Sequence, residues 1–142
     1  LCAGESRFRI DHFTGKSPYW QASVDLFEDD EEPEDLVRPD YDEVAKLYRR
    51  SLELSSDLRS MQSEDLELPA SPVGLSYVVS YTLDLDPAQK QALLETTSTS
   101  ERLRTLVGHL EENLRELELQ IARKQIAAKV RGNGDLGKPH EK

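Results

Sequence analysis

The alternation of polar and apolar residues near the start of the chain predicts two β-strands. In SRFRI, two arginines alternate with Phe8 and Ile10, which is the two-residue period of a strand with one wet face. A second run, YWQASVDLF, alternates in the same way, and the TGKSP between them supplies turn-forming glycine and proline. The two runs predict an antiparallel hairpin with a loop of about five residues.

Beyond residue 30 the apolar spacing changes to that of helices. Asp40 and Glu43 form a capping-box pattern that predicts the start of a helix, and this helix is expected to end near SMQSED. A second helix is predicted to start with Ser71 as its cap and Pro72 as its first residue. The segment that follows is rich in β-branched residues, but its apolar residues recur at helical spacing, and this spacing outweighs the composition. The apolar positions at helical spacing are Val44, Leu47, Tyr48, Leu52 and Leu58, and then Leu75, Val78, Val79, Thr82 and Leu83.

Two further helices follow. Asp86, with Gln89 three residues later, caps a short helix, and Ser98 with Glu101 opens the longest element, which is expected to reach about Arg131. At 1.5 Å per residue, about 30 residues span roughly 45 Å, so the last turns should project or find a partner. The apolar seam of this helix, whose first part we expect to be domain core, is Leu103, Val107, Leu110, Leu114, Leu117 and Ile121.

Length and charge limit the class of protein. The chain has 142 residues, one cysteine and a formal net charge of −10, which fits a single domain without a disulfide framework and disfavours nucleic-acid binding. No apolar run approaches the roughly 18 residues of a membrane span, and LCAGESRFRI lacks the apolar core of a signal peptide. We therefore expect a cytoplasmic protein without membrane contact. The acidic block EDDEEPED is expected to be a solvated, self-repelling loop rather than a calcium site.

The candidates for catalytic chemistry are weak. His12, His109 and His140 have no catalytic motif around them, and no metal-ligand spacing occurs. The stretch GNGDLGKP resembles a phosphate-binding loop, but Pro139 stands where the magnesium-binding Ser or Thr belongs, and a helix rather than a strand precedes it. Helix termination explains this stretch better. We expect neither a cofactor nor a metal, and no enzyme activity, with nucleotide hydrolysis as a distant alternative.

Four segments in order resemble the N-terminal domain of Lon protease, the LON substrate-binding domain. GESRFRI is similar to the strand signature of that family, PYWQASVDLFED to the strand that follows, and KQALLE and SERLRTLVGHLEENLREL to its later helices, as far as about Ile121. The resemblance implies an α+β fold in which the hairpin is the C-terminal part of a PUA-like β-barrel. The β-rich first half of the family domain and the ATPase and Ser/Lys peptidase modules of Lon are not matched. From this resemblance we expect that Leu1 is not a natural start.

These observations predict four segments and a binding role. The segments are a hairpin (1–30), an acidic loop (31–39), a helical subdomain (40–131) and a tail (132–142). The leading hypothesis is non-catalytic recognition of unfolded or partner polypeptide in Lon-like protein quality control, and the alternative is a structural module that forms homo-oligomers through the long helix. The candidate binding residues are Trp20, Val24 and Leu26, although we favour the simpler expectation that they are core against Leu75, Val79 and Leu83.

Overall fold

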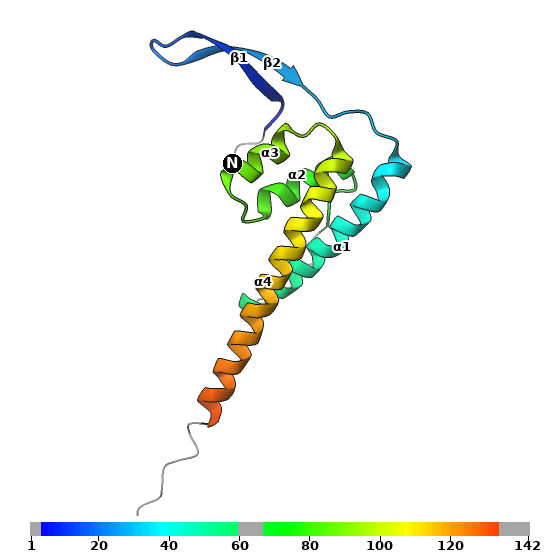
Figure 1. Cartoon of the computed structure of the whole chain (residues 1–142), viewed down its shortest axis with the longest axis vertical. Helices are drawn as coiled ribbons and strands as arrows, with labels where there is room; N and C mark the ends of the chain where they lie inside the picture. The colour runs from blue at the N-terminus through cyan, green and yellow to red at the C-terminus, as the bar shows by residue number, and fades with distance from the viewer. Residues whose placement is uncertain (1–3, 60–66, 134–142) are drawn as a thin grey trace, which may run out of the picture.

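The computed structural model describes residues 4–59 and 67–133 of the chain. They form a two-stranded ribbon followed by helices, which confirms the predicted α+β class and the order of hairpin and helical bundle (Figure 1). The elements are β1 (Arg7–Gly15), β2 (Gln21–Phe27), α1 (Glu34–Arg59), α2 (Pro72–Thr82), α3 (Pro87–Glu95) and α4 (Thr99–Asn133). The predicted end of the first helix near 60–65 and most of GNGDLGKP, including Lys138, lie outside the described residues.

The ribbon is antiparallel and stands at one end of the helices (Figure 1). Phe8 pairs with Leu26 and Ile10 pairs with Val24, and the register shifts by one residue between Ile10 and His12. The five residues 16–20 join the strands, so the loop has the predicted length but lies two residues later than TGKSP. The part of the chain that the structure describes holds one two-stranded sheet, so a PUA-like barrel stays a prediction.

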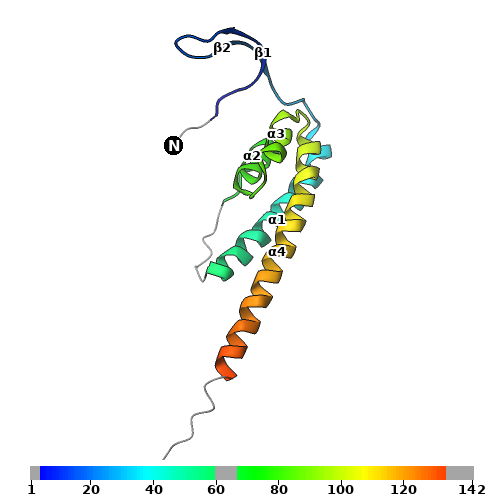
Figure 2. The same ribbon diagram turned by 60° about the vertical axis from the view of Figure 1, so that its left-hand side comes forward.

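Helices α1 and α4 lie side by side and run in the same direction (Figure 2). Ser51 donates a hydrogen bond to Asn113 at 2.6 Å, and Lys124 donates one to the Leu58 carbonyl at 2.8 Å. Helices α2 and α3 form the crossover between them; α2 packs beside the first half of α4, and α3 contacts α2 (Figures 1 and 2). The buried core residues are Val37, Tyr41, Val44, Ala45, Tyr48, Leu75, Val79, Leu83, Leu93, Leu103, Leu106 and Leu110.

The start signals of α2 and α3 act as the sequence predicts. The Ser71 hydroxyl accepts a hydrogen bond from the Gly74 N–H at 3.3 Å, and Asp86 forms a complete capping box with Gln89. Leu75 lies on the buried side of α2, which confirms that helical spacing outweighs the β-branched composition of this segment.

Helix α1 begins earlier than predicted. It starts at Glu34, not Asp40, so residues 34–39 are helical rather than part of the acidic loop, and Pro39 lies inside the helix. The Pro33 carbonyl accepts hydrogen bonds from the first turn, acidic residues there suit the positive end of the helix dipole, and Val37 is buried. These contributions offset the backbone hydrogen bond that a proline in the second turn removes.

Helix α4 is longer than the helix beside it. Its 35 residues extend over about 52 Å at 1.5 Å per residue, and it reaches Asn133, the last residue that the structure describes, close to the predicted end at about Arg131. The turns after Lys124 continue past the described end of α1 (Figure 2). Within the described residues, no helix combines the length and apolarity needed to cross a membrane.

Candidate functional site

The ribbon carries large apolar side chains on one face, and the solvent reaches all of them. Cross-strand pairing aligns Phe8 with Leu26 and Ile10 with Val24, and the register shift between Ile10 and His12 places Phe13 opposite Ala22 on the same face. The Phe13 and Trp20 rings meet edge to face, 5.1 Å apart. We call this set the apolar ribbon face: Phe8, Ile10, Phe13, Trp20, Val24 and Leu26.

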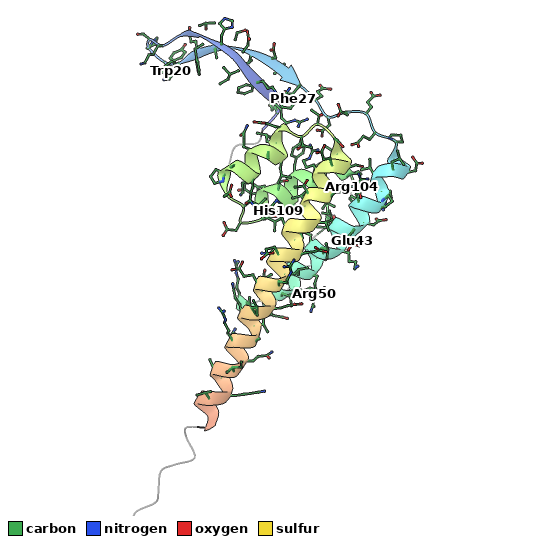
Figure 3. The ribbon with its side chains drawn as sticks, in the orientation of Figure 1. Trp20, Phe27, Glu43, Arg50, Arg104 and His109 are labelled. Carbon is green, nitrogen blue, oxygen red and sulfur yellow. The ribbon has the colours of Figure 1, made fainter. Side chains whose placement is uncertain are left out.

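The three candidate binding residues all belong to the apolar ribbon face. Trp20, Val24 and Leu26 are 61%, 42% and 71% exposed. The expectation that they are core against α2 is therefore wrong, because α2 buries Leu75 and Val79 against α1 and α4 instead. Trp20 lies toward the loop end of the ribbon, far from the helices, whereas Phe27 lies at the end next to them (Figure 3).

Arg7 fastens the base of the ribbon to the helices. Its guanidinium donates hydrogen bonds to the carbonyls of Leu94 and Thr96, at 2.9 and 3.0 Å, and pairs with the Asp29 carboxylate. The same guanidinium lies 4.6 Å from the centre of the Phe27 ring, within cation–π distance. These contacts join the first residue of β1 to the last turn of α3 and the residue that follows it.

A buried ion pair completes this junction. Arg102 of α4 is 0% exposed and binds both carboxylate oxygens of Asp29, at 2.7 and 3.0 Å. Its remaining hydrogen bonds go to the Ser76 hydroxyl at 2.9 Å and the Thr96 carbonyl at 2.7 Å. Because a bidentate arginine–carboxylate pair is geometrically specific, it fixes the end of β2 against α2 and α4. We call Arg7, Asp29 and Arg102 the Asp29 anchor.

The charge of this junction shifts two pKa values. Burial alone would raise the pKa of Asp29, but the hydrogen bonds and charge of Arg102, with those of Arg7, outweigh it and hold that pKa below its ordinary value. Burial raises the pKa of Tyr77, whose ring lies 4.4 Å from the Arg102 guanidinium. At neutral pH the junction therefore contains an ionised Asp29 and a neutral Tyr77.

The acidic block is only partly the solvated loop that its composition predicts. Besides Asp29, Glu32 is partly buried: it accepts hydrogen bonds from the Ser98 hydroxyl at 3.0 Å and the Ser100 N–H at 3.1 Å. The Asp30 carboxylate accepts one from the Thr97 hydroxyl at 2.8 Å. A negative side chain at the start of α4 is favourable there, so these acidic residues attach the block to the bundle.

A cavity of about 670 Å³ opens where the ribbon meets α2 and α3. Leu26, Phe27 and Tyr81 give it a largely apolar and aromatic wall. Tyr81 is 82% exposed and Leu94 is 44% exposed, so both are free to contact a ligand. The cavity is lined by Gly4, Glu5, Ser6, Arg7, Leu26, Phe27, Glu28, Asp29, Tyr77, Tyr81 and Leu94.

A second apolar surface lies on the outer side of α4. Leu119, Ile126 and Val130 are 58%, 63% and 67% exposed. At 100° per residue they fall within about 40° of one another, and opposite Leu110, which is fully buried in the core. We call these three residues the outer stripe of α4.

The residues that hold the junction together were not predicted. The sequence signal was Arg102, which directly precedes the buried Leu103 and lies beside the core seam of α4, where a charged residue requires a partner. Of the histidines, His12 contacts Asp11 at 2.7 Å on the exposed ribbon, and His140 lies outside the described residues. Among residues 4–59 and 67–133, no group of His, Cys, Asp and Glu side chains is placed to hold a metal ion.

Comparison with known proteins identifies the family. Residues 1–112 match the model of the ATP-dependent protease La (LON) substrate-binding domain. The chain is 32% identical to Lon protease 2 of Myxococcus xanthus over 130 residues, which are 91% of this chain. It is 30% identical to Lon protease of Methylocella silvestris over 119 residues, which are 84% of this chain. It spans about 15% of the length of each of these relatives. The match over residues 1–112 shows that the chain belongs to the LON substrate-binding domain family.

Proposed function

We propose that this chain is a non-catalytic recognition domain that binds extended or unfolded segments of other polypeptides through the apolar ribbon face. The observation that carries the proposal is the exposure of Trp20, Val24 and Leu26 along one side of a short ribbon. The description of the family as substrate-binding supports it. The relatives are Lon proteases of which this chain matches about 15%, so we propose recognition and not proteolysis as its contribution.

The energetics of the ribbon favour a partner. Each residue of the apolar ribbon face is at least 42% exposed, and fully burying one such side chain is worth about 1.5–3 kcal/mol. A two-stranded ribbon has marginal stability by itself, and contiguous exposed apolar surface commonly marks an interaction site. An extended polypeptide would cover this face and could also pair with a free strand edge.

A competing occupant of the same face is further β-structure from the same protein. The family resemblance implies that the ribbon forms part of a PUA-like β-barrel. In a barrel, the apolar ribbon face would be interior and closed to other polypeptides. The two occupants are distinguishable because the burial of this face by another polypeptide rises with the concentration of that polypeptide, whereas burial by β-structure of the same protein does not.

The test is a titration of the chain into a fluorescently labelled, permanently unfolded model protein, followed by anisotropy. We expect saturable binding, and we expect the triple variant Trp20→Ser, Val24→Ser, Leu26→Ser to lose it. The matched control replaces the outer stripe of α4, Leu119, Ile126 and Val130, with serine, since these side chains are comparably exposed. If the ribbon variant binds as tightly as the wild type, the proposal is wrong.

The outer stripe of α4 supports a second candidate function, homo-oligomerisation. Three exposed apolar side chains on the side opposite the core form the kind of seam through which helices pair. Sedimentation measurements would show an average mass that rises with concentration in the wild type and stays monomeric in Ile126→Ser, Val130→Ser. A wild-type mass that does not change with concentration would exclude this function.

A further inference from the structure

The cavity between the ribbon and α2 and α3 has a defined electrostatic character. Arg7 is the one cation among the lining residues; it is 12% exposed and pairs with Asp29, which Arg102 also binds. Arg9 lies next to the lining, with its guanidinium 4.4 Å from the centre of the Phe27 ring. The charged side chains of the lining that face solvent are Glu5 and Glu28. The cavity therefore combines an aromatic wall with two exposed carboxylates, and beside Glu5 or Glu28 it favours an apolar group that carries a positive charge next to it.

The size of the cavity suits a large side chain and its neighbours. Its volume of about 670 Å³ lies within the roughly 300–1,000 Å³ typical of ligand pockets. Tyr81 and Phe27 offer aromatic surface, and aromatic side chains are frequent anchors in binding sites. Leu94 completes the wall on the side of α3.

The cavity adjoins the apolar ribbon face at one residue, Leu26. Leu26 belongs to both, because it pairs with Phe8 on that face and also lines the cavity. Strand β2 has seven residues, or about 23 Å at 3.3 Å per residue. A single extended segment of about the same length could follow the ribbon and place one side chain in the cavity.

We propose that this cavity binds a large apolar side chain of the recognised polypeptide while a lysine or arginine next to it pairs with Glu28 or Glu5. The chain would then select apolar segments flanked by basic residues over those flanked by acidic ones. This inference rests on the proposed function, since it names the class of segment bound. It assigns the selectivity to Tyr81, Leu94 and Glu28, which lie outside the apolar ribbon face.

The experiment uses three labelled peptides with the same central apolar sequence around a phenylalanine, flanked by lysine, serine or glutamate. We expect the lysine peptide to bind most tightly and the glutamate peptide most weakly, with each exposed ion pair worth roughly two- to fivefold in affinity. Tyr81→Ala should weaken all three peptides by about tenfold, as truncation of an aromatic anchor does. Because Tyr81 is 82% exposed, its loss should leave the fold intact, which circular dichroism would check.

Glu28→Gln separates charge selection from apolar contact. It should reduce the preference for the lysine peptide and leave the serine peptide unchanged. Glu118→Gln, an exposed position on α4 away from the cavity, is the control and should change neither. Equal affinity of the three peptides for the wild type, or wild-type affinity of Tyr81→Ala, would overturn the inference.

The failure of this inference differs from the failure of the proposed function. If Trp20→Ala and Val24→Ser weaken binding while Tyr81→Ala and Glu28→Gln do not, polypeptide recognition stands and the cavity has no part in it. If the wild type binds none of the three peptides and no unfolded model protein, both proposals are wrong.

Discussion

Replacing Asp29 with asparagine tests how the ribbon is held on the helices. The change keeps the shape of the side chain but removes the charge that faces Arg102, a residue with no solvent exposure. It also turns one acceptor of the bidentate pair into a donor that points at a guanidinium. Arg102 would retain the Ser76 hydroxyl and the Thr96 carbonyl but would have no counter-charge.

The expected cost is large for a single substitution. Breaking a buried ion pair by removing one partner typically costs about 3–5 kcal/mol, because an uncompensated charge stays buried. Partial exposure of Asp29, at 13% of its side chain, places our expectation at the lower end, about 3 kcal/mol. This is a considerable fraction of the 5–15 kcal/mol that stabilises a typical domain.

The assay is urea denaturation at pH 7, followed by far-ultraviolet circular dichroism. The matched control is Asp30→Asn, because the neighbouring Asp30 carboxylate is exposed and accepts one neutral hydrogen bond from Thr97, worth about 1 kcal/mol or less. If Asp29→Asn destabilises the chain no more than Asp30→Asn does, then the Asp29 anchor does not fix the ribbon as we describe.

Three further predictions concern stability. Because the pKa of Asp29 is lower in the folded chain than its ordinary value, the anchor should contribute fully above about pH 4 and lose its contribution as the pH falls below that; denaturation from pH 7 to pH 2 should show a smaller loss in Asp29→Asn than in the wild type. Leu110→Ala should lower the free energy of unfolding by about 2–5 kcal/mol, since Leu110 is fully buried, whereas Leu119→Ala on the exposed side of α4 should lower it by under about 0.5 kcal/mol. Urea denaturation measures both losses, and equal losses would show that Leu110 is not part of the core. Asp86→Ala should cost about 1 kcal/mol through the lost α3 cap, and an unchanged unfolding midpoint would show that this cap contributes nothing.

Local features were the most predictable part of the fold. Ser71 before Pro72 and Asp86 before Gln89 act within one helical turn, so the sequence alone specifies where α2 and α3 begin. The start of α1 was missed because Pro39 and the acidic residues before it read as a loop. Burial of Val37 against the core, a tertiary contact, extends the helix back to Glu34.

The junction between ribbon and helices was not predictable in the same way. Asp29 and Arg102 are 73 residues apart in the sequence, and no local pattern pairs an acidic residue of a charged block with an arginine of a distant helix. Alternation correctly identified one apolar face of the hairpin, including Trp20. It could not show what covers that face, because the period of a strand specifies which residues share a side and not what lies against them.

Trp20 allows the most direct test of the central claim, that the apolar ribbon face binds polypeptide. It is the one tryptophan of the chain and is 61% exposed, so its fluorescence reports on this face alone. We expect emission typical of a solvated indole and ready quenching by acrylamide in the free chain. Addition of an unfolded, tryptophan-free polypeptide should then shift the emission to shorter wavelength and protect Trp20 from the quencher, in a saturable manner. An unchanged spectrum at concentrations of polypeptide that saturate binding, or a Trp20 already shielded in the free chain, would contradict this claim.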